Sequence, residues 1–422
     1  MDVHLITFGC KANQYDTQTF RQELEARGAN IVDAPEEADA CVVNTCTVTH
    51  KADRKARKNI RRAKRANEDL EILVAGCSAA QRTEDYVEMP AVDAIVEGHD
   101  EVEVGEKIVP EAPYAERDQE PVGAELLEEH QPRTRGWLKI QDGCDRNCAF
   151  CATKLARGDS RSRDPDDIVA EAKRLSETHS ELVFTGIHIG HYGRDLSPRG
   201  AEQEHTLSTL CARLLEEVPG VRFRLGSIEA TEIDELLLNL LATSGGRLVP
   251  HLHIPMQSGS NRILRRMRRW HTREDYRDRV REIARRLPYL GLGADVMVGF
   301  PGETEEDFRQ TRELVEELPY TYLHVFPFSG RKDTAASEMD DKVDPEVKNR
   351  RSKELRELGQ RKGERYRERR VGQAAEIVVE GNDYGMTEDY LRIQLEGDPA
   401  DRIGDKIYAP LDMQEGELVA RC

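Results

Sequence analysis

Three cysteines lie within eight residues in the middle of the chain, in the segment CDRNCAFC, as Cys144, Cys148 and Cys151. Thiolates at this spacing can bind one metal centre if the loop wraps around it, and soft sulfur ligands select zinc or iron–sulfur clusters. A structural zinc site normally takes four ligands, and no other Cys or His follows within the usual few residues. The spacing therefore predicts a 4Fe–4S cluster with one iron left open, and a closed zinc site is the alternative.

Three further cysteines, Cys10, Cys46 and Cys77, are separated by 36 and 31 residues, which is the spacing of successive βαβ units. Each one follows a short apolar run that is typical of a buried strand. The loops that follow parallel strands emerge at one edge of a sheet, where ligands bind. We therefore expect these thiols to converge on a second metal centre. Three separately buried thiols, or zinc bound with the help of His50, are the alternatives, and Cys41 is expected in the core.

The elements that position the N-terminal cysteines follow from the alternation of apolar and amphipathic segments over the first hundred residues. Strands are predicted at residues 4–8, 40–43, 72–75 and 94–96, with helices at 15–27 and 51–67. Such alternation indicates a parallel, doubly wound sheet. Residues 110–133 contain four prolines and many acids without a periodic apolar face, so they are interpreted as a linker.

A second series of strands and helices surrounds and follows the central cysteines. Strands are predicted at residues 137–140, 182–185, 222–226, 251–254, 294–298 and 323–326. Six βα units fall short of the eight that close a full barrel, so a partial (βα)6 barrel is expected. The last fifty residues contain short strands with glycines between them, which predicts a small antiparallel β-barrel of the kind that often binds nucleic acid.

The fold class predicted from the sequence is thus α/β with three parts. The predicted boundaries are 1–109 for the N-terminal cysteine-bearing domain, 110–133 for the linker, 134–368 for the partial barrel and 369–422 for the small barrel. No segment is apolar over a membrane-spanning length, and the chain enters a strand at once without a basic leader. We therefore expect a cytoplasmic protein without a membrane partner, in which nine cysteines serve as ligands or core residues rather than in disulfides.

The net charge of −18 argues at first against a nucleic-acid partner, but the charge is unevenly distributed. Residues 51–65 contain nine basic residues and one acid, which favours a phosphate-facing helix. Residues 262–286 and 348–370 each carry eleven basic residues against four acids, and ion-paired helix faces are an equal alternative there. The candidate RNA-binding residues are Arg54, Lys55, Arg57, Lys58, Arg61 and Arg62.

The segment CDRNCAFC, with Phe150 before the last cysteine, resembles the cluster loop of the radical S-adenosylmethionine (SAM) superfamily, whose fold is a partial barrel. The resemblance implies that the cluster held by Cys144, Cys148 and Cys151 binds SAM and that reductive cleavage releases a 5′-deoxyadenosyl radical. Three N-terminal segments, TFGCKANQYDTQ, VVNTCTVTHKADRKARK and VAGCSAAQR, resemble the methylthiotransferases within that superfamily. In that family the three N-terminal cysteines hold a second 4Fe–4S cluster, and the C-terminal module is the RNA-binding TRAM domain.

Within the methylthiotransferases, GCKxNQYDT and NTCTVTxxAD are most similar to the MtaB-type branch, which acts on N6-threonylcarbamoyladenosine next to the tRNA anticodon. The branch that acts on isopentenyl-adenosine would carry Gln-Met where Lys11 and Ala12 stand, and the branch that acts on a ribosomal protein aspartate would carry Pro-Lys. The predicted product is the 2-methylthio derivative. Alternatives are another tRNA adenosine, a ribosomal protein aspartate, or a non-catalytic RNA-binding protein that contains metal.

The resemblance also implies the roles of particular residues. The six catalytic and metal-binding residues are Cys10, Cys46, Cys77, Cys144, Cys148 and Cys151. Candidate cofactor-binding residues are Phe150 and three residues that follow barrel strands, Gly186, Glu229 and Gln257; a purely structural role in turns is the alternative for the glycine. The implied cofactors are two 4Fe–4S clusters and SAM, and the implied partners are a tRNA anticodon stem-loop, an electron donor such as flavodoxin or ferredoxin, and a sulfur donor.

Two segments depart from the family pattern. Ala152, Thr153 and Lys154 stand where Ile-Ile-Pro is usual, and Arg331-Lys332-Asp333-Thr334 replaces a glycine-containing RxGT segment. Both segments follow barrel strands, so we expect them to affect cofactor affinity or substrate fit without removing a cluster ligand.

Overall fold

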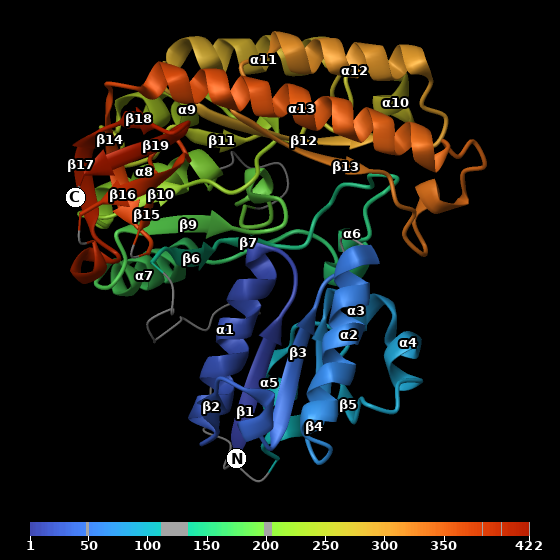
Figure 1. The fold of residues 1–422 in the computed structure, drawn as a ribbon. Helices are drawn as coiled ribbons and strands as arrows, with labels where there is room; N and C mark the ends of the chain where they lie inside the picture. The colour runs from blue at the N-terminus through green and yellow to red at the C-terminus, as the bar shows by residue number, and fades with distance from the viewer. Residues whose placement is uncertain (48–49, 111–133, 198–204, 382, 398, 422) are drawn as a thin grey trace.

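The computed structural model describes residues 1–47, 50–110, 134–197, 205–381, 383–397 and 399–421. Figure 1 shows an N-terminal sheet with its helices below, a larger βα part above it, and a C-terminal sheet at the side of that upper part. The segment predicted to be the linker lies, apart from Pro110, outside the described residues. Within the described part, no helix combines the length and the apolar character needed to cross a membrane.

The N-terminal part is a five-stranded parallel sheet in the order β2–β1–β3–β4–β5, which confirms the predicted doubly wound arrangement. The strands are β1 (Asp2–Thr7), β2 (Asn30–Val32), β3 (Ala40–Thr45), β4 (Glu71–Gly76) and β5 (Ala94–Ile95). The helices are α1 (Lys11–Ala26), α2 (His50–Ala66), α3 (Cys77–Gln81), α4 (Thr83–Val87) and α5 (Glu101–Ile108). The sheet is buried on both faces, because one set of apolar residues packs beneath α2 and another beneath α1 and α5.

The upper part is an open barrel of six parallel strands, as predicted. Its strands are β6 (Gly136–Lys139), β9 (Glu181–Thr185), β10 (Arg222–Arg224), β11 (His251–His253), β12 (Gly291–Val298) and β13 (Tyr322–Pro327). Two three-stranded ladders, β6–β9–β10 and β11–β12–β13, are joined by isolated parallel bridges between Phe223 and Leu248 and between Ser227 and His253. A short antiparallel pair, β7 (Gln141–Asp142) and β8 (Arg161–Ser162), borders the central cysteine loop.

Helices cover the outside of this barrel and bury its largest apolar cluster. They are α7 (Pro165–Ser176), α8 (Leu207–Glu217), α9 (Glu235–Thr243), α10 (Asn261–Arg266), α11 (Arg273–Arg286), α12 (Glu305–Glu317) and α13 (Pro345–Arg370), whereas the short α6 (Thr153–Arg157) lies between the barrel and α3. Their starts follow ordinary capping rules: Asp164 caps α7 ahead of Pro165, and capping boxes open α8, α11 and α12. The long helix α13 spans the upper part and leads into the C-terminal sheet (Figure 1).

The C-terminal part is a six-stranded sheet in the order β17–β14–β15–β16–β19–β18, consistent with the predicted small barrel. Its strands are β14 (Ala374–Val379), β15 (Tyr384–Thr387), β16 (Arg392–Glu396), β17 (Lys406–Pro410), β18 (Asp412–Gln414) and β19 (Glu417–Arg421). Its pairs are antiparallel except for β16 and β19. The fully buried Arg222 and Arg224 of β10 donate to main-chain oxygens of Glu376 and Thr387, so this sheet is tied to the N-terminal ends of the barrel strands.

Candidate functional site

The three N-terminal cysteines lie at one edge of the parallel sheet, as the strand order requires. Cys10 follows β1, Cys46 follows β3, and Cys77 follows β4 and begins α3. These strands are adjacent, and their registers bring the strand ends level with one another. The loops that carry the cysteines therefore meet at the carboxyl edge, which is where a doubly wound sheet binds its ligands.

Two glycines allow these loops to approach closely. Gly9 has φ +115° and Gly76 has φ +94°, values in a region that side chains disfavour. A Cβ added at Gly9 would stand 2.9 Å from the Sγ atom of Cys46, and one at Gly76 would stand 2.3 Å from Oδ1 of Asn44. Because Gly9 precedes Cys10, this contact places the first and second cysteine loops side by side.

Asn13 of α1 lies beneath the cysteine group and is fully buried. Its Oδ1 atom is 3.8 Å from the Sγ of Cys10 and 3.7 Å from the Sγ of Cys77. Its Nδ2 atom donates to the main-chain oxygens of Phe8 and Thr45 at 3.0 and 2.8 Å. One amide side chain thus contacts two of the three sulfurs. It also holds the segment before Cys10 and the end of β3 in place.

Arg157, the last residue of α6, reaches from the central cysteine loop to this group. Its Nε donates to the Sγ of Cys77 at 3.3 Å, and its Nη2 donates to Asn13 at 2.8 Å and to Asp16 at 2.6 Å. Its Nη1 donates to both carboxylate oxygens of Asp142 at 2.9 Å. The side chain is 1% exposed. The buried guanidinium of Arg157 therefore contacts residues of both parts of the chain, and the two cysteine groups lie at the interface between these parts.

The charges at this interface are balanced in pairs. Lys139 binds Asp16 at 2.7 Å and Asp142 at 2.9 Å. Burial by itself would raise the pKa of both carboxyl groups, but Arg157 and Lys139 hold each pKa below its usual range. Burial raises the pKa of the Cys77 thiol to about 12, and Arg157 opposes that shift. A ligand sulfur must be a thiolate, so the guanidinium supplies the cation that a thiolate at Cys77 needs in this dry position.

The central cysteines lie in the loop between β7 and α6, at the mouth of the barrel. Main-chain hydrogen bonds close the loop, from Cys151 to the oxygen of Cys148 at 3.1 Å and from Cys144 to the oxygen of Gly158 at 3.0 Å. All three cysteines are half-buried. Burial, and then the proximity of the other two sulfurs, raises the pKa of Cys144 to about 11. The three thiols therefore share one hydrogen-bonded loop.

Two barrel residues contact the sulfurs of this loop. The Nδ1 atom of His188 is 3.4 Å from the Sγ of Cys144. Arg269 approaches the Sγ of Cys148 at 3.8 Å and binds Glu229 at 2.5 Å. Burial raises the pKa of Glu229, and Arg269 acts in the opposite direction. The central group, like the N-terminal one, therefore has a buried arginine beside one sulfur.

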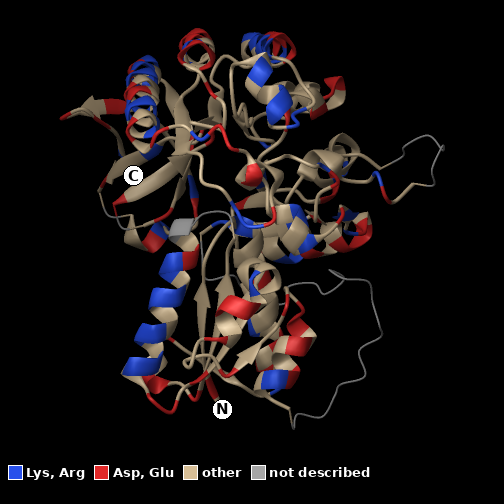
Figure 2. Cartoon of the chain, turned by 90° about the vertical axis from the view of Figure 1, so that its right-hand side faces the viewer, with Lys and Arg blue, Asp and Glu red and all other residues tan. Residues whose placement is uncertain are grey.

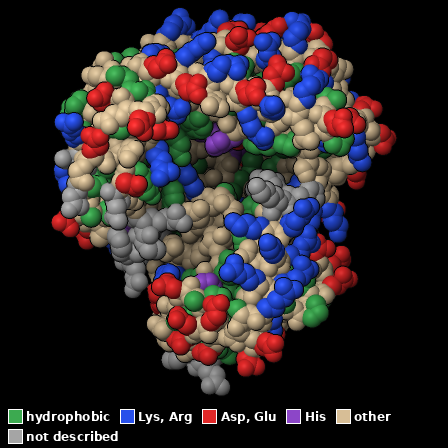
Figure 3. Space-filling model, in the orientation of Figure 1, with side chains coloured by type: hydrophobic (Ala, Val, Ile, Leu, Met, Phe, Trp, Pro, Cys, Tyr) green, Lys and Arg blue, Asp and Glu red, His purple; other side chains and the backbone are tan. Residues whose placement is uncertain are grey.

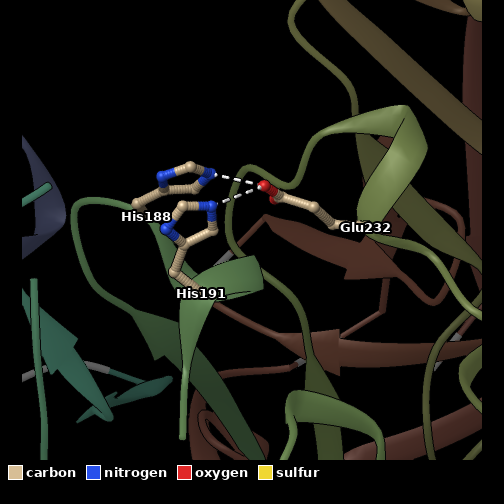
Figure 4. A group of neighbouring side chains, drawn as sticks. All are labelled: His188, His191 and Glu232. Carbon is tan, nitrogen blue, oxygen red and sulfur yellow. Dashed lines mark hydrogen bonds and ion pairs between the residues drawn. The ribbon is translucent and has the colours of Figure 1, made fainter. Parts of the chain in front are cut away.

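His188 also belongs to a buried group with His191 and Glu232 (Figure 4). One carboxylate oxygen of Glu232 accepts from His188 at 2.8 Å and lies 3.2 Å from Nε2 of His191, and the two imidazoles stack at 3.8 Å. Burial would raise the pKa of Glu232, but the hydrogen bond from His188 and the proximity of His191 lower it. This carboxylate fixes the ring orientation of His188 beside Cys144.

The four candidate cofactor residues occupy different surroundings. Phe150 is half-buried in an apolar cluster with Phe300 and Met297, between the cysteine loop and the ends of β12 and β13. A Cβ at Gly186 would stand 2.8 Å from the main-chain oxygen of Gln141, so this glycine is also required for packing. Glu229 is already paired with Arg269, as described above.

Gln257 is the candidate with a free polar atom. It adopts φ 63°, an uncommon value for a residue with a side chain, and it is held there by main-chain bonds to Asp295 and Met297. Its Oε1 atom is buried and has no hydrogen-bond partner among the described residues. A buried acceptor without a partner at the mouth of the barrel fits a bound polar cofactor.

The spacing of the sulfurs distinguishes between a cluster and a single metal ion. A tetrahedral zinc ion with bonds of about 2.3 Å brings its sulfurs to roughly 3.8 Å from one another. Within the described residues, three ligand atoms lie within 4.8 Å of one another at two places, and neither place includes a cysteine. Neither cysteine group therefore stands at the spacing of one zinc ion, and three soft thiolates are the ligands that an iron–sulfur cluster takes. The side chain of His50, the alternative fourth zinc ligand, lies outside the described residues.

The candidate RNA-binding residues lie along α2. Arg54, Lys55, Lys58, Arg61 and Arg62 are exposed, whereas Arg57 is half-buried and paired with Asp85 at 3.1 Å. Figure 2 shows basic residues along this helix, and Figure 3 shows them at the lower rim of a hollow between the N-terminal part and the barrel. The acid of this segment, Asp53, points inward and binds Arg331 at 3.0 Å. The outward face of α2 is therefore basic and borders the interface that holds both cysteine groups.

The other two basic segments differ from α2 because many of their arginines are paired with acids. Around α11, Arg277 and Arg281 bind Glu317, and Arg286 binds Glu235. On α13, Arg351 is buried against Glu303, Arg350 binds Glu305, and Arg370 is buried between Glu388 and Asp389. These pairs support the ion-paired interpretation of much of both segments.

The two departures from the family pattern are accommodated locally. Thr153 begins α6, so the segment after Cys151 is helical and leads directly to Arg157. Asp333 adopts φ 63°, the left-handed conformation in which a glycine would be unstrained. Arg331, in the same segment, binds Asp53 of α2 and thereby joins the barrel to the N-terminal part.

Several residues of the site were not singled out from the sequence. Asn13, Asp16, Lys139 and Asp142 form the interface network with Arg157, yet each of these four is an ordinary polar residue in its own segment. Their only signal is position, since each lies within a few residues of a cysteine or at the end of a strand that leads to one. The distances that make them a network are set by the packing of two separate folding units.

Comparisons with known proteins find matches to two family models and to named relatives over most of the chain. Residues 2–98 match the family model described as "Uncharacterized protein family UPF0004", and residues 138–315 match that of the radical SAM superfamily. A threonylcarbamoyladenosine tRNA methylthiotransferase MtaB from Bacillus subtilis is 38% identical, over 93% of this chain and 89% of that protein. The enzyme of the same name from Thermotoga maritima is 31% identical over 99% of both chains.

A tRNA-2-methylthio-N(6)-dimethylallyladenosine synthase from Geobacillus kaustophilus is 32% identical, over 90% of this chain and 72% of that protein. Among solved structures, the radical SAM methyltransferase TsrM from Kitasatospora setae, solved with cobalamin and a [4Fe-4S] cluster, superposes with a TM-score of 0.57. The superposition covers 80% of this chain and 77% of TsrM at 17% identity, so it supports the fold alone.

Proposed function

The chain belongs to the MtaB-type family of radical SAM methylthiotransferases, and we propose that it converts N6-threonylcarbamoyladenosine beside the tRNA anticodon to its 2-methylthio derivative. The observation that carries this proposal is Arg157. It follows Cys151 by six residues and donates to Cys77, so both cysteine groups open toward the same interface. An enzyme that must both activate a carbon and deliver sulfur to it needs two such groups within reach of one substrate.

In this proposal the domain division is 1–109, 134–368 and 369–422 with a linker at 110–133, and each part has a task. Cys144, Cys148 and Cys151 hold one 4Fe–4S cluster, and Cys10, Cys46 and Cys77 hold the other. When bound, the clusters and SAM supply a carbon radical that removes hydrogen and the methylated sulfur that replaces it. Gln257 and Glu229 bind polar atoms of SAM, Gly186 leaves room for it, and Phe150 packs beneath the cluster loop.

The remaining residues position these groups and exclude water. Arg157 and Asn13 orient Cys77 and Cys10, while Arg269 and His188 orient Cys148 and Cys144. The buried ion pairs at the interface help to exclude water from the reacting carbon. Without this exclusion, the carbon radical would react with groups other than the substrate. The exposed face of α2 and the C-terminal sheet bind the anticodon stem-loop. An electron donor such as flavodoxin or ferredoxin, a sulfur donor and a cytoplasmic location are further parts of the proposal.

The proposal is tested with anaerobically reconstituted enzyme, SAM, a reductant, a sulfide source and stem-loop RNAs. One RNA carries threonylcarbamoyladenosine, a second carries dimethylallyladenosine, and a third carries unmodified adenosine. Mass spectrometry of the released nucleosides should show the methylthio product from the first RNA only. Product from the second RNA alone would assign the chain to the other tRNA activity, and cofactor cleavage without product from any RNA would refute a tRNA substrate.

A further inference from the structure

Three polar side chains lie side by side on the inner face of the barrel, one on each of its last three strands: His253 of β11, Asp295 of β12 and His324 of β13. The registers bring them together, because Asp295 pairs directly with His324 and His253 pairs with the residue two positions before Asp295. On the other face of β13, Leu323 and Val325 contact α13. His324 therefore points away from the helices and into the barrel.

Hydrogen bonds determine how these rings are held. One oxygen of Asp295 lies 3.1 Å from Nε2 of His253 and 3.3 Å from Nδ1 of His324. The hydroxyl of Tyr322 lies 3.2 Å from Nδ1 of His253 and 2.8 Å from Nε2 of His251. Every one of these contacts is satisfied if His251 donates to Tyr322, Tyr322 donates to His253, and both His253 and His324 donate to the carboxylate.

This assignment gives the Nε2 of His324 no partner within the group; the Nδ1 of His251 also has none among the described residues, but it is buried. The side chain of His324 is 60% exposed, whereas those of Asp295 and His253 are 27% and 10% exposed. His324 is also the only histidine classed as exposed within the described part of the chain. The main-chain N–H of Gln257 donates to the oxygen of Asp295 at 2.8 Å, so this group lies beside a candidate cofactor-binding residue at the mouth of the barrel. A ring fixed at Nδ1 and open at Nε2 is prepared to bind a polar group that enters the mouth of the barrel.

We propose that His324, held by Asp295 and His253, binds the polar substituent on N6 of the target adenosine. The inference rests on the proposed function and specifies how that site chooses its substrate. A threonylcarbamoyl group carries a hydroxyl and an N–H group, both of which can donate to this unprotonated imidazole nitrogen. A dimethylallyl group carries none, so it would desolvate the polar wall formed by His324 and Tyr322 without replacing the lost hydrogen bonds.

The same three ligand atoms lie within 4.8 Å of one another, a spacing that also suits a divalent metal ion bound by two imidazoles and a carboxylate. The hydrogen bonds favour the substrate role. With the protons placed as above, the carboxylate is neutralised by two N–H donors, and no lone pair of His253 faces it. A metal ion would have to displace both of these donated hydrogens. A metal ion bound by these three residues would therefore contradict the proposal.

The test compares binding of the cluster-loaded enzyme to the three stem-loop RNAs described above, at fixed salt. The variant His324→Phe keeps an aromatic ring and removes both nitrogens. It should weaken binding of the threonylcarbamoyl RNA by roughly ten- to a hundredfold, the effect of losing a buried hydrogen bond. Affinity for the unmodified RNA and reductive cleavage of SAM should remain unchanged. His324→Gln should recover part of the loss, and His205→Phe, a half-buried histidine outside the barrel strands, serves as the matched control.

Three results would overturn the inference: equal losses for all three RNAs, no loss for the threonylcarbamoyl RNA, or a non-cluster metal ion in the wild-type enzyme that disappears in His324→Phe. Thermal unfolding of each variant shows whether a loss reflects folding. Failure of the wild-type enzyme to modify the threonylcarbamoyl RNA would instead refute the proposed function, so the two failures are distinguishable.

Discussion

The two cysteine groups have similar chemistry but are assembled in opposite ways. The central group comes from one loop of eight residues, is half-buried, and is closed by hydrogen bonds within that loop. The N-terminal group comes from three strands of a parallel sheet, and two of its sulfurs are buried while Cys10 is exposed. The first group therefore depends on local sequence, and the second depends on the whole N-terminal fold.

Their surroundings differ accordingly. Beside the central group, Arg269 pairs with one carboxylate, Glu229. Beside the N-terminal group, Arg157 pairs with two carboxylates, the buried Asp16 and the half-buried Asp142, and comes from the other part of the chain. The arginine beside the central group thus comes from the barrel itself, whereas the arginine beside the N-terminal group comes from the other side of the interface. This difference predicts that the N-terminal cluster, if bound as proposed, is sensitive to how the two parts dock and that the central cluster is not.

The largest effect is expected from Cys148→Ala, which removes a ligand of the central group. Both SAM cleavage and methylthiolation should be abolished, because the first step of the reaction requires that cluster. SAM cleavage measured by chromatography, together with iron content, checks this prediction. Cys211→Ala, which alters a buried cysteine far from either group, is the control and should retain both activities. Normal cleavage in Cys148→Ala would remove the central loop from the chemistry.

A selective loss is expected from Cys46→Ala in the N-terminal group. Methylthiolation should be abolished and iron content should fall by half, while reductive cleavage of SAM remains measurable. This result would separate the roles of the two groups within one chain. Normal iron content with impaired folding would instead favour three buried thiols with no metal.

The same contrast explains how much of the site could be predicted from the sequence. The central group is visible as a spacing, and the N-terminal group is visible because each cysteine follows a strand. Both sheets and the open barrel follow from periodicity and strand length. The contacts of Arg157 with Cys77 and Asp16 could not be predicted, because they join residues 80 and 141 positions apart through a docking geometry that no local pattern encodes.

An intermediate effect is expected from Arg157→Gln, which leaves Asp16 and Asp142 with Lys139 as their remaining cation. Loss of one partner of a buried ion pair typically costs about 3–5 kcal/mol of unfolding free energy, and loss of a residue that orients a metal ligand lowers metal affinity about 10- to 100-fold. The electron paramagnetic resonance signal of the N-terminal cluster should weaken or shift, and that of the central cluster should not.

Arg157→Lys keeps the positive charge but loses the planar guanidinium. Compared with Arg157→Gln, it should therefore recover more of the unfolding free energy than of the electron paramagnetic resonance signal of the N-terminal cluster. Arg269→Gln is the matched change beside the central group, and it should alter the central signal instead. Equal changes of both signals in either variant would contradict the separation of the two electrostatic environments.

The smallest effect concerns the basic surface that the N-terminal part contributes. Arg61 and Arg62 on α2 are exposed, and reversing both charges should lower the slope of log affinity against log salt by about two and weaken stem-loop binding at low salt. Fluorescence anisotropy across a salt series measures this, with unfolding midpoints as the check on folding.

Arg361 and Arg365 on α13 are also exposed, and they provide the matched double reversal. If RNA docks along α2 beside the cysteine interface, only the first pair should matter, since α13 covers the outside of the barrel. If both double charge reversals changed the salt slope and the affinity equally, RNA would be attracted by basic residues anywhere on the surface rather than by α2.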